Sequence, residues 1–249
     1  MGAGFAERAV LALTLGLIAA LGNVAGGWFI TQREWPREFL KYFVALGAGF
    51  MLATAFLEMI PESLRLRSDV APVFLLVLGG YLLVHLFEHT FAPHFHFGEE
   101  THAVPMRHAH ASWAALLGLT IHTFFDGVAI ASGAIVSVGL VMLIFFAIFL
   151  HKLPEGFTVS SLMLAGGHSR RAAFQSAALL GAATLAGAGM MLLFCGAVAA
   201  ALPFSAGVTI YVAASDLIPE VNKEPRVGVA LAVFLGVLGM LLLRALFHL

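Results

Sequence analysis

Long apolar segments alternate with short polar ones along the whole chain. Each apolar segment holds about 20 residues or more, the length that an α-helix needs to cross the hydrocarbon core of a bilayer. This pattern predicts an all-α, polytopic membrane protein with eight transmembrane helices. The predicted spans cover residues 6–30, 39–62, 72–90, 112–135, 139–163, 173–196, 200–220 and 226–247.

The composition agrees with a chain that lies mostly in a lipid bilayer. Of its 249 residues, 61% are hydrophobic and only 11% are charged, which is more apolar side chain than a soluble domain of this length can bury. We therefore interpret residues 1–249 as one transmembrane domain, whose first apolar run is a retained helix and not a cleaved signal. The net charge of −1 excludes a nucleic-acid partner. The single cysteine, Cys195, excludes an intrachain disulfide or a thiolate cluster.

The loops predict an orientation, because Lys and Arg near helix ends favour the cytoplasm. With the N-terminus outside, the inner loops collect eight basic residues and the outer side holds four. The eight are Arg33, Arg37, Lys41, Arg107, Arg170, Arg171, Lys223 and Arg226. The four are Arg8, Arg65, Arg67 and Arg244. We therefore expect an integral protein of the cell membrane with both termini extracytoplasmic.

A short internal repeat links the second and seventh predicted spans. The segment from Glu58 to Glu62 reads EMIPE, and the segment from Asp216 to Glu220 reads DLIPE. With three spans before the central pair and three after it, these two segments run in opposite directions through the bilayer. This is the pattern of inverted repeats in secondary transporters, whose binding site lies near mid-membrane. The sequence thus predicts a 3+2+3 arrangement, with helices 1–3 and 6–8 flanking helices 4 and 5.

The loop between the third and fourth spans, residues 89–111, is rich in histidine. It carries six histidines from His89 to His110, together with two glutamates. Imidazole is the commonest metal ligand in proteins, so we expect this cytoplasmic loop to capture or sense metal. The candidate ligands are His94, His96, His102, His108 and His110. The alternative is a flexible polar connector, because a His-rich tract is a compositional signal only.

Two central spans carry charged motifs where lipid-facing charge is costly. HTFFDG begins at His122 and HKLPEG begins at His151. Each motif places a carboxylate four residues after its histidine, Asp126 in the first and Glu155 in the second, so both groups share one helix face. Together the two helices can offer two imidazoles and two carboxylates to one divalent cation.

Ionisable side chains within spans are expensive and usually functional. In this chain they are Glu58, Asp126, Lys152, Glu155 and Asp216. As an alternative, Lys152 neutralises one carboxylate in a buried ion pair, but this leaves the other acids and both histidines unexplained. Oxygen and imidazole ligands without thiolate suit Zn²⁺ best, and also Fe²⁺, Mn²⁺ or Cd²⁺. Met51 lies two helical turns before Glu58 and can add a thioether, although packing is the commoner role of such a residue.

HTFFDG and HKLPEG resemble the helix 4 and helix 5 signatures of the ZIP (Zrt/Irt-like) metal transporters, and residues 49–62 are similar to that family's helix 2. The resemblance implies zinc uptake into the cytoplasm by an elevator-like movement, and suggests a homodimer. It implies primary ligands at four positions, an added ligand at Met51, and pathway residues at Glu58 and Asp216. The primary ligands are His122, Asp126, His151 and Glu155.

The chain departs from the family where many members hold a second metal ion. The positions of the helix 4 amide, a helix 5 acid and a helix 6 acid are matched here by Thr123, Lys152 and Thr184. Two hydroxyls and an ammonium thus replace an amide and two acids. We expect the ammonium to repel a second divalent ion and to reduce repulsion between the carboxylates when the site is empty. The sequence therefore predicts a single-metal site.

Two other classes of function remain open from the sequence. A metal exporter or channel can use the same ligands, because sequence does not determine the direction of flux. His85, Glu88 and His89 also satisfy the H-x-x-E-H pattern of zinc peptidases, with Glu88 as the base. This motif lies at the end of a predicted span and lacks an assigned third ligand, so we expect a transporter and not an enzyme.

Overall fold

The computed structural model describes residues 3–32, 37–91, 109–165, 167–219 and 227–246, and within these ranges it contains helices and short turns but no strands. The first half of the bundle comprises α1 (Ala3–Gln32), α2 (Arg37–Thr54), η1 (Ala55–Met59), α3 (Ile60–Leu66), α4 (Val70–Phe91) and α5 (Ala109–Val136). The second half comprises α6 (Val138–Ala165), α7 (Arg170–Leu193), η3 (Cys195–Ala197), α8 (Val198–Tyr211), η4 (Val212–Leu217) and α10 (Val227–Leu246). Of these, η1 and η4 are π-helical and η3 is a 3₁₀ turn.

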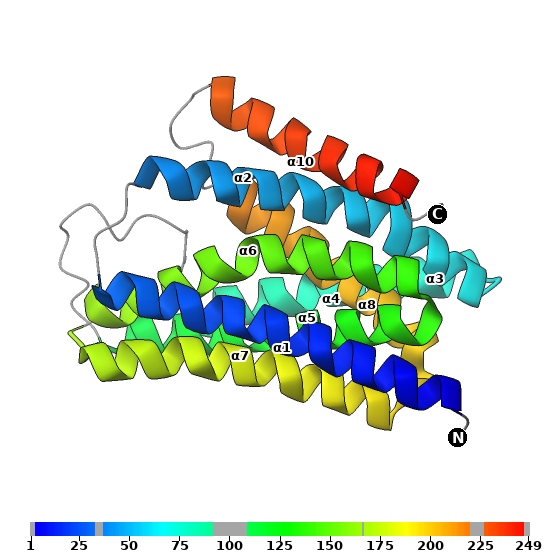
Figure 1. The fold of residues 1–249 in the computed structure, drawn as a ribbon, viewed down its shortest axis with the longest axis horizontal. Coiled ribbons are helices and arrows are strands. Elements are labelled where there is room, and N and C mark those ends of the chain that lie inside the picture. The colour runs from blue at the N-terminus through cyan, green and yellow to red at the C-terminus, as the bar shows by residue number, and fades with distance from the viewer. Residues whose placement is uncertain (1–2, 33–36, 92–108, 166, 220–226, 247–249) are drawn as a thin grey trace.

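Eight stretches of the described helices are long and apolar enough to cross a membrane. They are Gly4–Ile30, Ala45–Leu66, Val70–Phe87, Leu116–Val136, Val138–Ser161, Arg170–Leu193, Cys195–Ser215 and Val227–Leu246. These stretches confirm the predicted all-α, polytopic fold with eight spans. In Figure 1 the first turn of α1 and the last turn of α10 lie at the same end of the bundle, as an even number of spans requires.

The two motif-bearing helices lie in the middle of the bundle. In Figure 1, α2 and α10 lie on one side, α1 and α7 lie on the other, and α6 runs between them. Within the apolar windows of α5 and α6, 61% and 59% of the residues are buried, whereas the values for α4 and α10 are 17% and 22%. The charged motifs are therefore on well-buried helices, whereas most of α4 and α10 is exposed on the outside of the bundle.

Four helix pairs cross at reciprocal glycines: α1 with α6, α5 with α7, α2 with α10, and α4 with α8. In each pair, a Cβ on either glycine would overlap the backbone carbonyl of the residue three positions before the partner's glycine. In the same order, the pairs are Gly26 with Gly156, Gly127 with Gly187, Gly49 with Gly236, and Gly80 with Gly207. Small residues at membrane helix crossings let the backbones approach closely, which replaces the hydrophobic driving force that lipid does not supply.

These crossings support the predicted inverted repeat. In the predicted repeat, spans 1–3 correspond to spans 6–8, and span 4 corresponds to span 5. Under this correspondence, the α1–α6 crossing is equivalent to the α7–α5 crossing. Likewise, the α2–α10 crossing is equivalent to the α8–α4 crossing. The π-helical segments also correspond, because η1 ends two residues before Pro61 and η4 ends two residues before Pro219. The 3+2+3 repeat itself stays a prediction.

The crossings generate a stability prediction on α7. We expect Gly187→Ala to lower the free energy of unfolding by about 1–3 kcal/mol, because its Cβ would overlap the Phe124 carbonyl and force the helices apart. Thermal unfolding of the purified protein in detergent measures this. Gly189→Ala on the same helix is the matched control, since a Cβ there meets open space. Equal melting temperatures for the two variants would contradict the prediction.

Candidate metal centre

Four potential ligands converge between α5 and α6. The helices present His122 and Asp126 from one side and His151 and Glu155 from the other, with one ligand atom of each residue within 4.8 Å of the others. None of the four side chains is more than 4% exposed. The i and i+4 spacing within each helix therefore brings all four groups together, as the sequence predicts.

Apolar side chains close the site along the bundle axis. Towards the connection between α5 and α6, one cluster packs Ile130 against Ile144 and their neighbours. Towards the opposite ends of the two helices, another cluster includes Leu116 and Val159. The four potential ligands thus lie near the middle of their helices, and apolar side chains separate them from both ends of the bundle.

One oxygen, Oδ2 of Asp126, is the focus of the site. Lys152 Nζ donates a hydrogen bond to it at 2.6 Å. His151 Nε2 lies 3.3 Å from the same oxygen, and His122 Nε2 lies 3.4 Å from it. The two imidazole rings are 5.6 Å apart between centroids and are tilted by 35°. Both rings therefore point towards the carboxylate that the ammonium already binds.

Glu155 is held by groups on both helices. Its Oε1 accepts a hydrogen bond from the Thr123 hydroxyl, and its Oε2 accepts one from Lys152 Nζ at 2.7 Å. Lys152 is completely buried, so its ammonium bridges two buried carboxylates inside the bundle. Burying a charge in a low-dielectric interior costs much less free energy when the charge is paired and hydrogen-bonded. The buried ion pair considered from the sequence is thus present, and it is part of the ligand cluster.

The two histidines have the bonding pattern of metal ligands. Within the described part of the chain, both ring nitrogens of His122 are buried and have no hydrogen-bond partner, which is costly for an imidazole. His151 Nδ1 lies 3.1 Å from the Ala147 carbonyl and, as its N–H tautomer, donates to it. With this tautomer the lone pair of His151 Nε2 is available to a metal ion, and a carbonyl behind a metal-binding imidazole is the usual supporting contact. With the other tautomer, Nε2 donates a hydrogen bond to Asp126 Oδ2 at 3.3 Å. A cation between these groups would give His122 a partner.

Comparison with known proteins agrees with this geometry. The sequence profile of one protein family, described as ZIP zinc transporter, matches residues 7–112 and 94–244. The chain belongs to the ZIP zinc transporter family. It is thus an integral membrane protein of a transporter family, which confirms the expectation that it is not an enzyme.

Individual ZIP relatives align over most of the chain. Zinc transporter ZIP9-A of Xenopus laevis is 27% identical over 271 residues, covering 87% of this chain and 88% of that protein. Zinc transporter ZIP9 of Micropogonias undulatus is 33% identical over 264 residues, covering 84% of each. Zinc transporter zipt-7.1 of Caenorhabditis briggsae is 24% identical over 257 residues, covering 79% of this chain and 66% of that protein.

For the other residues singled out from the sequence, the structure either describes their packing or leaves the side chain outside the description. Met51 is completely buried in an apolar cluster that includes Ala147, one turn before His151, and its role as a ligand stays a prediction. Thr184 is buried on α7 and donates a hydrogen bond to the Leu180 carbonyl at 3.3 Å. The side chain of Asp216, on η4, lies outside the described part of the chain.

The His-rich loop falls largely outside the described residues. His94, His96, His102 and His108 belong to residues 92–108, and the side chain of His110 at the start of α5 is also outside the description. In the H-x-x-E-H segment, the His85 ring contacts Tyr211 with their centroids 6.0 Å apart. The side chains of Glu88 and His89 are outside the described part. Metal capture by the loop therefore stays a prediction.

Sequence reasoning missed two polar partners that come from distant helices. Asn23 on α1 is completely buried against Lys152 and Glu155. Arg244 on α10 forms an ion pair with Glu58, with Nε 3.0 Å from Oε1. A lone amide in an apolar span is itself an available signal. The partner of Glu58 has no such signal, because η1, which carries Glu58, and α10 are distant in sequence.

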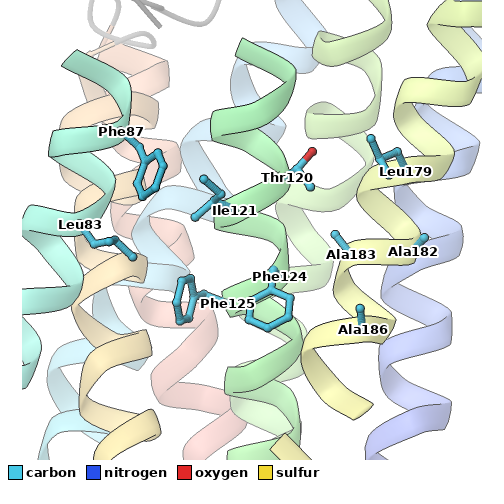
Figure 2. Close-up of a pocket in the computed structure, with 10 residues that line it drawn as sticks. All are labelled: Leu83, Phe87, Thr120, Ile121, Phe124, Phe125, Leu179, Ala182, Ala183 and Ala186. Carbon is cyan, nitrogen blue, oxygen red and sulfur yellow. The ribbon is translucent and has the colours of Figure 1, made fainter. Parts of the chain in front are cut away.

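A large apolar groove lies on another face of α5 and is not the metal site. Figure 2 shows it between α4, α5 and α7. Its volume is about 620 Å³. Of the described residues that line it, only Thr120 is polar, and the Thr120 hydroxyl already donates to the Leu116 carbonyl at 2.6 Å. The groove therefore offers no ligand to a metal ion.

The buried ammonium generates a prediction on stability and metal. We expect Lys152→Met to lower the free energy of unfolding of the metal-free protein by about 3–5 kcal/mol, because two buried carboxylates lose their cation. Zinc should restore most of this loss, since it supplies the missing positive charge. Thermal unfolding with and without zinc measures both effects. Arg244→Met removes a cation away from the four ligands and should show no comparable rescue by zinc.

Proposed function

We propose that this ZIP protein transports zinc across the membrane through one intramembrane site formed by His122, Asp126, His151 and Glu155. The buried imidazole of His122, whose ring nitrogens have no hydrogen-bond partner among the described residues, is the observation that supports this site most directly. Two imidazoles and two carboxylates without thiolate suit Zn²⁺, and the same set can accept Fe²⁺, Mn²⁺ or Cd²⁺. The relatives described as zinc transporters favour zinc among these ions.

The site holds one divalent ion. Lys152 Nζ lies within 2.7 Å of an oxygen on each carboxylate, so a positive charge of the protein already occupies the neighbouring position. The Thr123 hydroxyl donates a hydrogen bond to Glu155 and adds no negative charge that would attract a second cation. A second divalent ion would have to approach an ammonium in a low-dielectric environment, where like charges repel strongly.

Transport runs into the cytoplasm by an elevator-type movement. In this movement α5 and α6 carry the metal ion together with α1 and α7, which they contact closely, while α2, α4, α8 and α10 stay fixed in the bilayer. Glu58 and Asp216 line the pathway at the two ends, and Met51 on α2 adds a thioether ligand. The His-rich loop binds metal on the cytoplasmic side, and the protein forms a homodimer in the cell membrane with both termini outside.

Uptake into proteoliposomes tests the transport site. We expect the parent protein to accumulate zinc and His122→Ala to lose nearly all saturable uptake, because the variant lacks one of four enclosed ligands. His168→Ala is the matched control, since His168 lies in the connection between α6 and α7, next to Ser112, and should not affect uptake. Parallel assays with Fe²⁺, Mn²⁺ and Cd²⁺ compare the metals, and preloaded vesicles reveal export. Zinc flux that is unchanged in His122→Ala would contradict the proposed site.

Metal counting tests the single-ion site. We expect the purified protein to bind one intramembrane zinc ion per chain, and Lys152→Asp to bind two, because the substitution replaces the ammonium with a carboxylate. Elemental analysis and native mass spectrometry measure the ratio after residues 92–108 have been replaced by a linker without histidine. Two tightly bound ions in the protein that keeps Lys152 would disprove this point.

A further inference from the structure

Asn23 brings a third helix to the metal site. It is the completely buried amide on α1 that faces α6. The amide is oriented with its nitrogen towards α6, because this orientation gives hydrogen-bond partners to both its nitrogen and its oxygen. In this orientation the side-chain nitrogen lies 2.6 Å from the Lys152 carbonyl oxygen and 3.3 Å from Glu155 Oε2. The opposite orientation would place an oxygen against these two acceptors. The nitrogen therefore donates to the backbone and to the carboxylate of the same helical turn.

The surrounding backbone is built for this contact. A Cβ on Gly156 would overlap the backbone of Asn23, and a Cβ on Gly22 would lie only 3.0 Å from the Cβ of Lys152. Because glycine occupies both positions, α1 approaches α6 closely enough for a short side chain to reach Glu155. The approach also seals the Lys152 side chain inside the bundle, where it is 0% exposed.

We propose that Asn23 is a positioning residue of the metal site, which holds the Glu155 carboxylate in the orientation that receives the metal ion. This inference rests on the proposed function of Glu155 as a ligand. Glu155 receives donors from three directions: Thr123 on α5, Lys152 on its own helix and Asn23 on α1. Hydrogen bonds behind a ligating carboxylate fix its direction, and their loss typically weakens metal binding about 10–100-fold.

The test compares zinc affinity with stability in the full-length protein. We expect Asn23→Leu, which keeps the approximate size but removes the donor, to weaken zinc binding about 10–100-fold, as measured by isothermal titration calorimetry. Asn23→Ala provides the same loss without a larger side chain, in case Leu prevents folding. The half-saturation concentration for zinc uptake should rise in parallel.

Ser160→Ala is the matched control. It removes a buried hydrogen bond from the Ser160 hydroxyl to the Ala173 carbonyl, which also joins α6 to a neighbouring helix but lies beyond the ligands. We expect this variant to lose stability and to bind zinc with the affinity of the parent. If both Asn23 variants only melt earlier and bind zinc normally, Asn23 has a structural role alone and the inference is wrong. If His122→Ala also binds zinc normally, the proposed site itself fails.

Discussion

The energetic cost of burying charge in a membrane interior governs the arrangement of this protein. Two carboxylates and one ammonium lie in the middle of the bundle with at most 3% of each side chain exposed. Such groups persist there only when they are paired and hydrogen-bonded. Asp126, Glu155 and Lys152 satisfy one another, and donors from α1 and α5 complete the shell around Glu155. The site is thus also the polar core around which the central helices pack.

The glycine crossings provide the close approach that this polar core requires. At each crossing, a glycine on either helix faces a carbonyl of its partner, so the two backbones interlock. Sliding one helix along the other by a residue would bring a Cβ into that carbonyl. The proposed elevator movement therefore keeps the paired helices together and takes place at the other contacts, such as those of α2 with α6 and of α5 with α8.

The sequence was sufficient to predict the eight spans and the local half of the site. His122 with Asp126, and His151 with Glu155, are four residues apart on one helix, and helical periodicity is a property of the sequence. The sequence did not predict which residues on distant helices are in contact. Asn23 and Arg244 lie on α1 and α10, and their partners depend on which helices pack together. The glycines themselves can be read in the sequence, but which glycine faces which depends on how the helices pack.

The buried lysine has an electrical consequence. With neutral histidines, the empty site holds two carboxylates against one ammonium and carries one net negative charge, whereas a bound divalent ion changes it to one net positive charge. For a site that moves across the membrane field, each elementary charge is worth about 2.3 kcal/mol per 100 mV. In the proposed elevator movement, a negative cell interior would pull the loaded site inward and push the empty site outward. The fixed ammonium would thereby let the membrane potential drive both halves of the proposed cycle.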